Sequence, residues 1–565
     1  MNLRRATVAL VIVCFASLAS LLAGEKTAEH KKGVIVAVSE PGAEAGLAIL
    51  KAGGNAVDAA VATAFALAVT HPAAGNIGGG GFMVVHPSRR AEPRKGPELL
   101  PTVIEYRETA PAAATRTMFK KGDSPYQHKM VGTPGTVAGM ALAHRKFGKL
   151  PWKSLVMPAV ELAEKGYLLD KHHADSLNNI LKSARSPSEL HRVFAKPDGT
   201  KWMPGDRHLQ PDLAKTLRLI AEEGSDAFYQ GKIADQIAAE MKAGGGLITK
   251  DDLAKYQAME RAPIHGTYRG YDVYSPPPPC SGGTCLVMVL NILERFDLKK
   301  HDRYSPQTLH LMTETMRLAY ADRARFLGDP AFTKIPEHLT TRKYAGELVK
   351  KINLDKASRS EDVAKDIELT PEGDSTTHFS IIDKDGMAVS NTYTLEHSFG
   401  SRIVVKGAGF LLNNEMMDFN WRPGITTKKG DIGTEPNTVA PGKKMLSSQT
   451  PTILARDGKV FLVTGSPGGR TIINTVLNVV VNVVDYDMPI QKAIDAPRMH
   501  HQWFPDELKF EGNKQYPEAV KALQDMGHRV NYSRQGDAHS IWINPKTGGY
   551  VGAADKRLSG KVSGY

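Results

Sequence analysis

The most restrictive feature of this sequence is a change of pattern at about residue 375. From about 110 to 350, apolar residues recur at helical spacing, as in "MPAVELAEKGYLL" and "LAKTLRLIAEEG". From 378 onward, β-branched runs such as "HFSIID" and "VFLVTG" predominate, with one later helix expected in "RTIINTVLNVVVNVVDY". The polar segment "SRSEDVAKDIELTPEGDS" between them has no period, which predicts a flexible connection. It ends at three hydroxyl residues, Ser375, Thr376 and Thr377.

The region from 33 to 86 combines both patterns. It predicts a strand, a helix, a turn, a second helix, a Gly-rich loop and a strand. Asn55 suits a helix cap with Asp58 in the first turn, and Gly53 and Gly54 separate the two helices. Because both helices are rich in alanine, we expect them to pack closely on a flat surface such as a sheet.

The first 24 residues are typical of a secretory signal peptide. Arg4 and Arg5 precede an apolar run, and Ala23 and Gly24 supply small residues before the chain turns polar. An uncleaved membrane anchor is the alternative, because the run is close to the lower length limit for a span. No other stretch is apolar enough to cross a bilayer. We therefore expect an exported protein, periplasmic or secreted.

Composition excludes some classes of protein. The 565 residues are 23% charged and 41% apolar, as in a globular chain. The formal charge of +12 suits anionic ligands, but it is spread thinly and without interleaved aromatic residues, which argues against nucleic-acid binding. After the signal, only Cys280 and Cys285 remain. The sequence is compatible both with a disulfide between them and with a pair of buried thiols.

Two glycine-rich segments invite a phosphate-binding interpretation. "GNIGGGGF" at 75–82 follows a helix and precedes a strand, which is the reverse of the order in phosphate-binding loops. "TGSPGGRT" at 464–471 runs from strand into helix but lacks the lysine of a P-loop. We interpret these glycines as sites of close backbone approach or as bare amides that can face an oxyanion.

The sequence predicts no metal and no cofactor. The pairs His172-His173 and His500-His501 are adjacent residues whose rings point in different directions, and neither pair has a Cys or carboxylate at ligand spacing. Surface or supporting roles are expected for them. The motifs G-x-S-x-G and H-E-x-x-H are absent, which argues against a serine hydrolase with a nucleophile elbow and against a zinc protease.

The segment after the connection predicts a β-hairpin. "KDG" is a three-residue loop with Gly386 in the left-handed conformation, and it pairs Asp383 with Met387. Extending this ladder places Thr394 opposite Thr376, to within about one residue. Paired threonines occur in ordinary sheets, but one hydroxyl can also orient the other for chemistry.

A threonine hydroxyl needs a base before it can act as a nucleophile near neutral pH. When threonine is the first residue of a chain, its own α-amino group, with a reference pKa of about 8, can take the proton. The backbone must then be cut before the threonine, and the connection ending at Ser375 is where such a cut could happen. The hairpin register and the need for a base single out Thr376, whereas Thr377 is expected to be an ordinary strand residue.

Several long motifs follow one another in a fixed order. In chain order they are "NIGGGGFM", "YRETAP" and "GTPGTVAGM" in the first half and "TTHFSIIDKDGMAVSNTYTLEHSFGS", "GFLLNNEMMDF", "MLSSQTPT", "VTGSPGGRTI" and "APRMHHQW" in the second. With these motifs, nearly everything after the signal resembles the γ-glutamyltransferases, members of the N-terminal-nucleophile hydrolases. The resemblance implies an α+β fold, specifically a four-layer αββα sandwich, and an autocatalytic cut between Ser375 and Thr376.

This cut would give a large subunit of residues 25–375 and a small subunit of residues 376–565 that stay associated as a heterodimer. The resemblance makes Thr376 both nucleophile and, through its new amino group, general base. Thr394 matches the family's second threonine, which holds the nucleophile in place. Gly468 and Gly469 match the glycines whose amides form the oxyanion hole.

The resemblance further implies a γ-glutamyl amide as substrate, such as glutathione, whose acyl group passes to water, an amino acid or a peptide. Arg107 matches the arginine that binds the substrate's α-carboxylate, which suits a guanidinium fork. Ser447 and Ser448 match the serines that bind the same carboxylate. Glu415 and Asp418 match the two acids that hold the α-ammonium.

Two departures from the family pattern leave questions open. Glu396 occupies a position where many relatives have Asn; its carboxylate could accept a hydrogen bond from the ammonium but would repel a misplaced carboxylate. The segment from 419 to 446 is long enough for a lid but contains no tyrosine to cap the pocket. The sequence therefore does not decide whether this segment closes as a lid, nor the balance between water and amine acceptors.

Two other functions are considered. A relative could act on another acyl donor, such as poly-γ-glutamate or a cephalosporin side chain, although Arg107, Glu415 and Asp418 are suited to a free amino-acid head. A catalytically degenerate binding protein is the other alternative, and the intact Thr376 and Thr394 argue against it.

Overall fold

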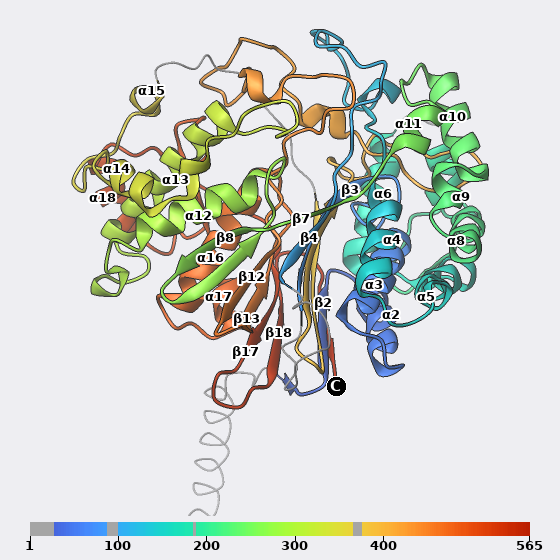
Figure 1. Ribbon diagram of the computed structural model, residues 1–565, viewed down its shortest axis with the longest axis horizontal. Helices are drawn as coiled ribbons and strands as arrows, with labels where there is room; N and C mark the ends of the chain where they lie inside the picture. The colour runs from blue at the N-terminus through green and yellow to red at the C-terminus, as the bar shows by residue number, and fades with distance from the viewer. Residues whose placement is uncertain (1–27, 88–99, 185–187, 365–375) are drawn as a thin grey trace, which may run out of the picture.

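The computed structural model describes residues 28–87, 100–184, 188–364 and 376–565. Two seven-stranded antiparallel sheets lie face to face in the middle of the molecule, and helices cover the outer face of each sheet (Figure 1). The predicted mixed α+β class is therefore confirmed. The predicted signal peptide at 1–24 and Ser375 lie outside the described residues.

Both sheets contain strands from both halves of the chain. Sheet I has the order β19 (Lys561–Gly564), β2 (Gly33–Ala37), β10 (Thr377–Asp383), β11 (Ala388–Thr394), β3 (Gly80–His86), β4 (Thr102–Tyr106) and β7 (Met259–Arg261). Sheet II has the order β1 (Glu29–His30), β18 (Tyr550–Ala554), β17 (His539–Ile543), β13 (Lys459–Thr464), β12 (Thr452–Arg456), β9 (Tyr271–Ser275) and β8 (Ile264–Tyr268). Segments before and after residue 375 thus complete each other's hydrogen-bond ladders.

The predicted hairpin is the centre of sheet I. Strand β10 pairs with β11 in the register that sets Thr377 opposite Tyr393 and Ile382 opposite Ala388. The same register continues outward to Thr376 and Thr394. In the loop, Asp383 N donates to Met387 O, and Gly386 has φ of +81°. The predicted loop type and register are confirmed.

The region from 33 to 86 folds as its pattern predicts. It forms β2, α2 (Glu40–Lys51), α3 (Ala56–Thr70), the Gly-rich loop and β3. Asn55 caps α3 by accepting from the amides of Val57 and Asp58, and the Asp58 carboxylate accepts from the Asn55 amide. This reciprocal pair satisfies amides that the first helical turn leaves without partners.

The remaining helices form two groups. Those on the side of sheet I are α4 (Thr136–Phe147), α5 (Trp152–Lys165), α6 (Lys171–Ser183), α7 (Glu189–Phe194), α8 (Pro211–Glu223), α9 (Asp226–Tyr229), α10 (Lys232–Gly244) and α11 (Lys250–Lys255). Those on the side of sheet II are α12 (Ser281–Leu293), α13 (Pro306–Phe326), α14 (Arg342–Val349), α15 (Ser360–Val363), α16 (Thr471–Val484), α17 (Ile490–Asp495) and α18 (Pro517–Asp525).

Short elements connect these layers. They are the strand pair β5 (Tyr167–Leu168) and β6 (Arg207–His208), a small sheet of β14 (Met499–His500), β15 (Leu508–Phe510) and β16 (Val530–Asn531), and the 3₁₀ turns η1 (His128–Met130), η2 (Leu298–Lys300), η3 (Glu337–Thr340), η4 (Glu415–Asp418) and η5 (Glu435–Asn437).

Two details differ from the sequence prediction. The mainly helical region contains the β8–β9 hairpin, which closes an edge of sheet II. The mainly stranded half contains α17 and α18 besides the expected α16. Both differences involve elements of nine residues or fewer, in which periodicity is a weak signal.

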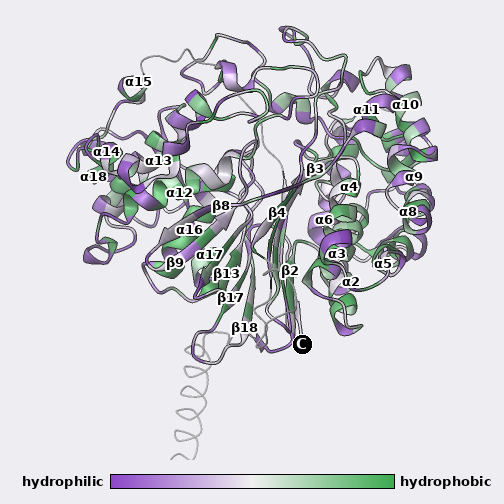
Figure 2. Cartoon of the chain, viewed as in Figure 1, coloured by the Kyte–Doolittle hydropathy of each residue, from purple (hydrophilic) through white to green (hydrophobic). Residues whose placement is uncertain are grey.

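The hydrophobic core forms three layers because side chains alternate along the strands. Val34 and Val36 of β2 face the space between the sheets, whereas Ile35 and Ala37 face the helices. A third cluster fills the space between sheet II and its helices. Figure 2 shows hydrophobic residues concentrated on the central strands, with hydrophilic residues frequent on the outer helices. Among the described residues, no helix is both long enough and apolar enough to span a membrane.

The Gly-rich loop allows close backbone approach, as one of the two sequence interpretations predicts. A Cβ at Gly79 would lie 2.0 Å from the Thr394 carbonyl oxygen, and one at Gly80 would lie 2.4 Å from that of Tyr106. The loop therefore packs directly against the end of β11, and no side chain fits between them.

We expect Gly79→Ala to destabilise the protein by about 3 kcal/mol or more, because the added methyl group meets backbone rather than a movable side chain. Gly122→Ala is the matched control: Gly122 also lies in a loop, but nothing surrounds its Cβ position, and only its φ of +95° opposes a side chain. It should cost about 1–2 kcal/mol. Urea unfolding of both variants measures the difference, and equal midpoints would contradict the role given to Gly79.

Candidate active site

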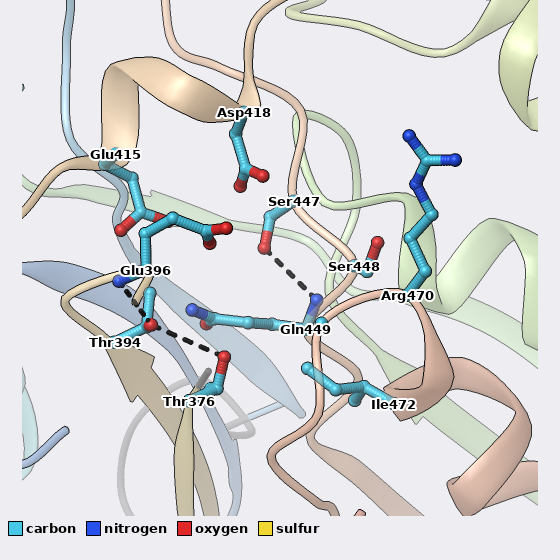
Figure 3. Close-up of a pocket in the computed structure, with 11 residues that line it drawn as sticks. Thr376, Thr394, Glu396, Glu415, Asp418, Ser447, Ser448, Gln449, Arg470 and Ile472 are labelled. Carbon is cyan, nitrogen blue, oxygen red and sulfur yellow. Dashed lines mark hydrogen bonds between the residues drawn. The ribbon is translucent and has the colours of Figure 1, made fainter. Parts of the chain in front are cut away.

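A pocket of about 290 Å³ opens at the end of sheet I where β10 begins and β11 ends. Its lining comes from residues far apart in the sequence (Figure 3). The lining residues are Thr376, Thr394, Glu396, Glu415, Asp418, Ser447, Ser448, Gln449, Gly469, Arg470 and Ile472. Eight of the ten side chains and glycines predicted from the sequence as catalytic or substrate-binding are among them.

The two threonines lie side by side, as the hairpin register requires. Thr376 Oγ1 donates to Thr394 Oγ1 at 3.4 Å, and Thr394 Oγ1 also accepts from the amide of Glu396 at 2.8 Å (Figure 3). Thr376 is 8% exposed, whereas Thr377 is buried in the sheet and does not line the pocket. Of the two hydroxyl residues here that the structure describes, Thr376 and Thr377, Thr376 is the one that lines the pocket.

Asn76, which the sequence prediction missed, supports the second threonine. Its side-chain Nδ2 donates to the Thr394 carbonyl at 2.9 Å, while its Oδ1 accepts from the Gly79 amide and the Thr136 hydroxyl. Asn76 lies in the Gly-rich loop, so that this loop holds the backbone of Thr394 from behind. The "GNIGGGGF" pattern marked the loop but not the role of its asparagine.

Three carboxyl groups gather on one wall of the pocket. Glu415 and Asp418 are the first and last residues of η4, and Glu396 follows β11 with φ of +75°, a conformation that is strained for a residue with a side chain. One oxygen from each of the three lies within 4.8 Å of the others. Such a cluster favours a cation, either an ammonium group or a metal ion.

Arg107 lies behind these acids and does not line the pocket. Its guanidinium is fully buried and donates to Glu415 and Asp418, with Glu108 at 3.4 Å. Burial opposes the charge, but these carboxylates raise the pKa of Arg107 overall. The arginine that the resemblance assigns to a carboxylate is thus paired with the two acids that the resemblance assigns to an ammonium.

The carboxyl groups around Arg107 outnumber it, which changes their ionisation. Burial raises the pKa of Glu108 to about 7, although Arg107 acts in the opposite direction. Burial also raises the pKa of Glu415, with Glu108 and Asp418 adding to the effect against Arg107. The acid-rich wall can therefore gain negative charge as the pH passes through neutrality.

Ser447 and Ser448 lie on a different part of the pocket lining, where the chain meets the start of α12. Ser447 N donates to Pro279 O, and Ser447 Oγ accepts from the Gln449 amide at 3.1 Å (Figure 3). Gln449 was not predicted as a site residue. Its side-chain amide is buried and makes no hydrogen bond to any described residue, which leaves it for a ligand.

Gly468 and Gly469 form the turn between β13 and α16. Their φ values are +127° and +52°, which only glycine adopts without strain. Gly469 lines the pocket, and Gly468 precedes it in the turn. Arg470, the next residue, also lines the pocket and was not singled out from the sequence.

The segment from 419 to 446 is held at several points. Arg470 Nη1 donates to Gly430 O at 2.7 Å, and Thr434 Oγ1 donates to Ala324 O on α13. Trp421 stacks on Phe119, with ring centroids 4.8 Å apart. In this conformation the segment is therefore linked, through Arg470, to the turn that carries Gly469.

Three of the four paired histidines, His173, His500 and His501, are buried rather than on the surface, which corrects part of the sequence prediction. His500 and His501 are fully buried, and His500 Nδ1 is 2.7 Å from Asn474 Nδ2 of α16. His173 is also buried, 3.2 Å from a ring nitrogen of His71. Adjacent residues can both be buried here because packed elements approach them from different sides. None of these histidines lines the pocket.

Cys280 and Cys285 are free thiols. Burial raises the pKa of both Cys280 and Cys285 to about 12, which makes them poor nucleophiles. The other described group with metal-binding spacing is His310, Glu314 and His528. Two of its ring nitrogens are hydrogen-bonded to each other at 2.7 Å, and none of the three lines the pocket.

Together, the two sheets and a pocket that combines a hydroxyl pair, a carboxyl cluster and a glycine turn suit an acyl-transferring enzyme. The family model "Gamma-glutamyltranspeptidase" matches residues 42–565. This chain belongs to the gamma-glutamyltranspeptidase family. The predicted family is thereby confirmed.

Individual relatives agree with this assignment. A glutathione hydrolase proenzyme of Escherichia coli (strain K12) is 46% identical over 545 residues, covering 95% of this chain and 92% of the relative. The crystal structure of a cephalosporin acylase from Bacillus halodurans is similar with a TM-score of 0.83 at 28% identity, covering 96% and 97%. A gamma-glutamyltranspeptidase from Pseudomonas nitroreducens, solved with L-DON, is 40% identical with a TM-score of 0.53, covering 57% and 96%.

The raised pKa of Glu108 predicts a pH-dependent stability. A carboxyl whose folded pKa of about 7 exceeds its unfolded value destabilises the fold increasingly as the pH rises from about 4.5 to 7. The free energy of unfolding of Glu108→Gln, relative to that of the wild type, should therefore increase by about 1–3 kcal/mol from pH 5 to pH 8.

Urea unfolding at the two pH values measures this difference. Glu105→Gln is the control, because Glu105 is a buried carboxylate paired with Lys444 and Arg261. It should lose stability at both pH values. A constant difference between wild type and Glu108→Gln across this range would contradict the prediction.

Proposed function

We propose that this chain is a self-processing γ-glutamyltransferase with glutathione hydrolase activity. It would cleave γ-glutamyl amides through an acyl-enzyme and pass the γ-glutamyl group to water, an amino acid or a peptide. The observation that carries the proposal is the position of Thr376, whose hydroxyl lies in the pocket against that of Thr394 and beside the carboxyl cluster. Family membership, and a relative with the name of a glutathione hydrolase proenzyme, support it.

The maturation we propose removes a signal at 1–24 and cuts the chain between Ser375 and Thr376. The products are a large subunit of 25–375 and a small subunit of 376–565, in a periplasmic or secreted heterodimer. Interleaved strands support lasting association, because β2 and β3 of the large subunit flank the β10–β11 hairpin of the small one. The helix, sheet, sheet, helix order supports a four-layer αββα sandwich of the N-terminal-nucleophile type.

In the proposed mechanism, the cut converts the Thr376 peptide nitrogen into an amine. This amine takes the proton from Thr376 Oγ1, which attacks the γ-carbonyl carbon of the substrate while Thr394 holds the oxygen in place. The amides of Gly468 and Gly469 stabilise the oxyanion. The leaving amine takes the proton from the α-ammonium of Thr376 as the amide bond breaks. Water or an acceptor amine then attacks the ester on Thr376, and the γ-glutamyl group passes to it.

The charges of the pocket support an amino-acid head as the recognised group. Glu415 and Asp418 would hold the α-ammonium, with Glu396 as a third acid. Ser447 and Ser448 would donate to the α-carboxylate. Arg107 is the proposed carboxylate ligand from the resemblance, and it would need to exchange at least one of its two acid partners for the substrate.

A second candidate is a family relative that acts on another acyl donor, such as poly-γ-glutamate or a cephalosporin side chain. The similarity to a cephalosporin acylase structure favours it. An acyl group without an ammonium, however, would leave the cluster of Glu396, Glu415 and Asp418 uncompensated. We therefore prefer the γ-glutamyl donor.

Thr376→Ala tests the proposed function. The wild type should give two bands on a denaturing gel and hydrolyse a γ-glutamyl anilide, whereas the variant should stay as one chain without activity. Thr376→Ser keeps a hydroxyl and should retain some of both. An uncut, inactive wild type would refute the mechanism, and two bands without γ-glutamyl activity would favour the second candidate.

Thr394 should affect rate rather than folding. Thr394→Val keeps the shape but removes the hydroxyl that contacts Thr376 and the Glu396 amide, so we expect kcat to fall about 10- to 100-fold. Thr394→Ser restores the hydroxyl and should restore most of the rate. Steady-state kinetics on the processed enzyme decide this, and equal rates for the Val variant and the wild type would exclude the role.

A further inference from the structure

Arg323, on α13, is a buried cation next to the pocket that neither the sequence motifs nor the family match assigns to the site. It is 5% exposed. Its Nε donates to Ser281 Oγ at 2.9 Å, and its Nη2 donates to Ser448 Oγ at 2.9 Å. The guanidinium therefore reaches the pocket through the side chain of Ser448.

These contacts determine which way the serine hydroxyl groups donate. Ser281 Oγ donates to Ser447 O at 2.6 Å and accepts from Arg323. Ser448 Oγ accepts from Arg323, and Ser447 Oγ accepts from the Gln449 amide. Because each oxygen of the Ser447–Ser448 pair already accepts a hydrogen bond, its O–H remains as a donor to a ligand in the pocket.

The charge of Arg323 points to the same kind of ligand. In the part of the chain that the structure describes, Arg323 forms hydrogen bonds with serines and no ion pair with a carboxylate. Arg107, by contrast, is paired with two carboxylates. A buried cation without a counter-charge is costly, and an anionic group bound at Ser448 would offset that cost.

We propose that Arg323 is a positioning residue that orients Ser448 and supplies positive charge for the α-carboxylate of the donor. This inference rests on the proposed function and deepens it. It restricts the donors to acyl groups that carry a free carboxylate as well as an ammonium. Arg107 would contact the carboxylate directly only after it exchanges one of its acid partners, whereas Arg323 supplies positive charge behind Ser448 without such an exchange.

The test compares two inhibitors that differ only in the α-carboxylate, L-glutamate and 4-aminobutyrate, on the processed enzyme. In Arg323→Gln, we expect KM for a γ-glutamyl anilide and the inhibition constant of L-glutamate to rise about 10- to 100-fold. The inhibition constant of 4-aminobutyrate should change less than about 3-fold, and kcat should change less than KM. Arg323→Lys keeps the charge, and its KM and its inhibition constant for L-glutamate should lie between those of Arg323→Gln and the wild type.

Arg325→Gln is the matched control, because Arg325 lies on the same helix and pairs with Asp322. It should leave both inhibition constants unchanged. If Arg323→Gln does not fold, Arg323→Lys carries the test with the same two inhibitors. Equal rises for L-glutamate and 4-aminobutyrate, or no rise for either, would overturn the inference while leaving a γ-glutamyl-active wild type. A wild type without γ-glutamyl activity would instead refute the proposed function.

Discussion

The antiparallel pairing of β10 with β11 is the constraint on which the rest of the site depends. Its register brings the hydroxyl groups of Thr376 and Thr394 together at the mouth of sheet I. The pairing of β11 with β3 then brings the Gly-rich loop and Asn76 behind Thr394. Because β2 and β3 from the first half of the chain pair with β10 and β11 from the second half, these ladders would still join the two halves after a cut before Thr376.

The pocket lining has two parts of different chemical character. One part carries three carboxyl groups with Arg107 buried behind them. The other carries two serine hydroxyls with Arg323 buried behind Ser448. An excess of acid on one side, and on the other a cation that pairs with no carboxylate among the described residues, suit a ligand that carries both an ammonium and a carboxylate. The hydroxyl of Thr376 opens into the same pocket, which is where such a ligand would present its reactive bond.

Much of the fold could be predicted from local sequence patterns, because interactions between neighbouring residues determine caps, turns and long regular elements. The cap at Asn55 and the loop at Gly386 each involve neighbouring residues. Short elements such as β8 and α18 were missed because too few residues repeat within them. The family motifs predicted the pocket lining almost completely. They did not indicate a role for Gln449, nor for Asn76 and Arg323, whose side-chain hydrogen bonds join segments distant in the chain.

The sequence by itself determined the order of helices and strands, the hairpin register and the candidate nucleophile, since these follow from periodicity, turn chemistry and motifs. Only the tertiary structure decided the charge pairing of the site. Arg107 donates to Glu415, which is 308 residues away in the sequence, and Arg323 donates to Ser448, which is 125 residues away. Whether a buried cation is compensated depends on which groups surround it in space, and spacing along the chain carries no information about that.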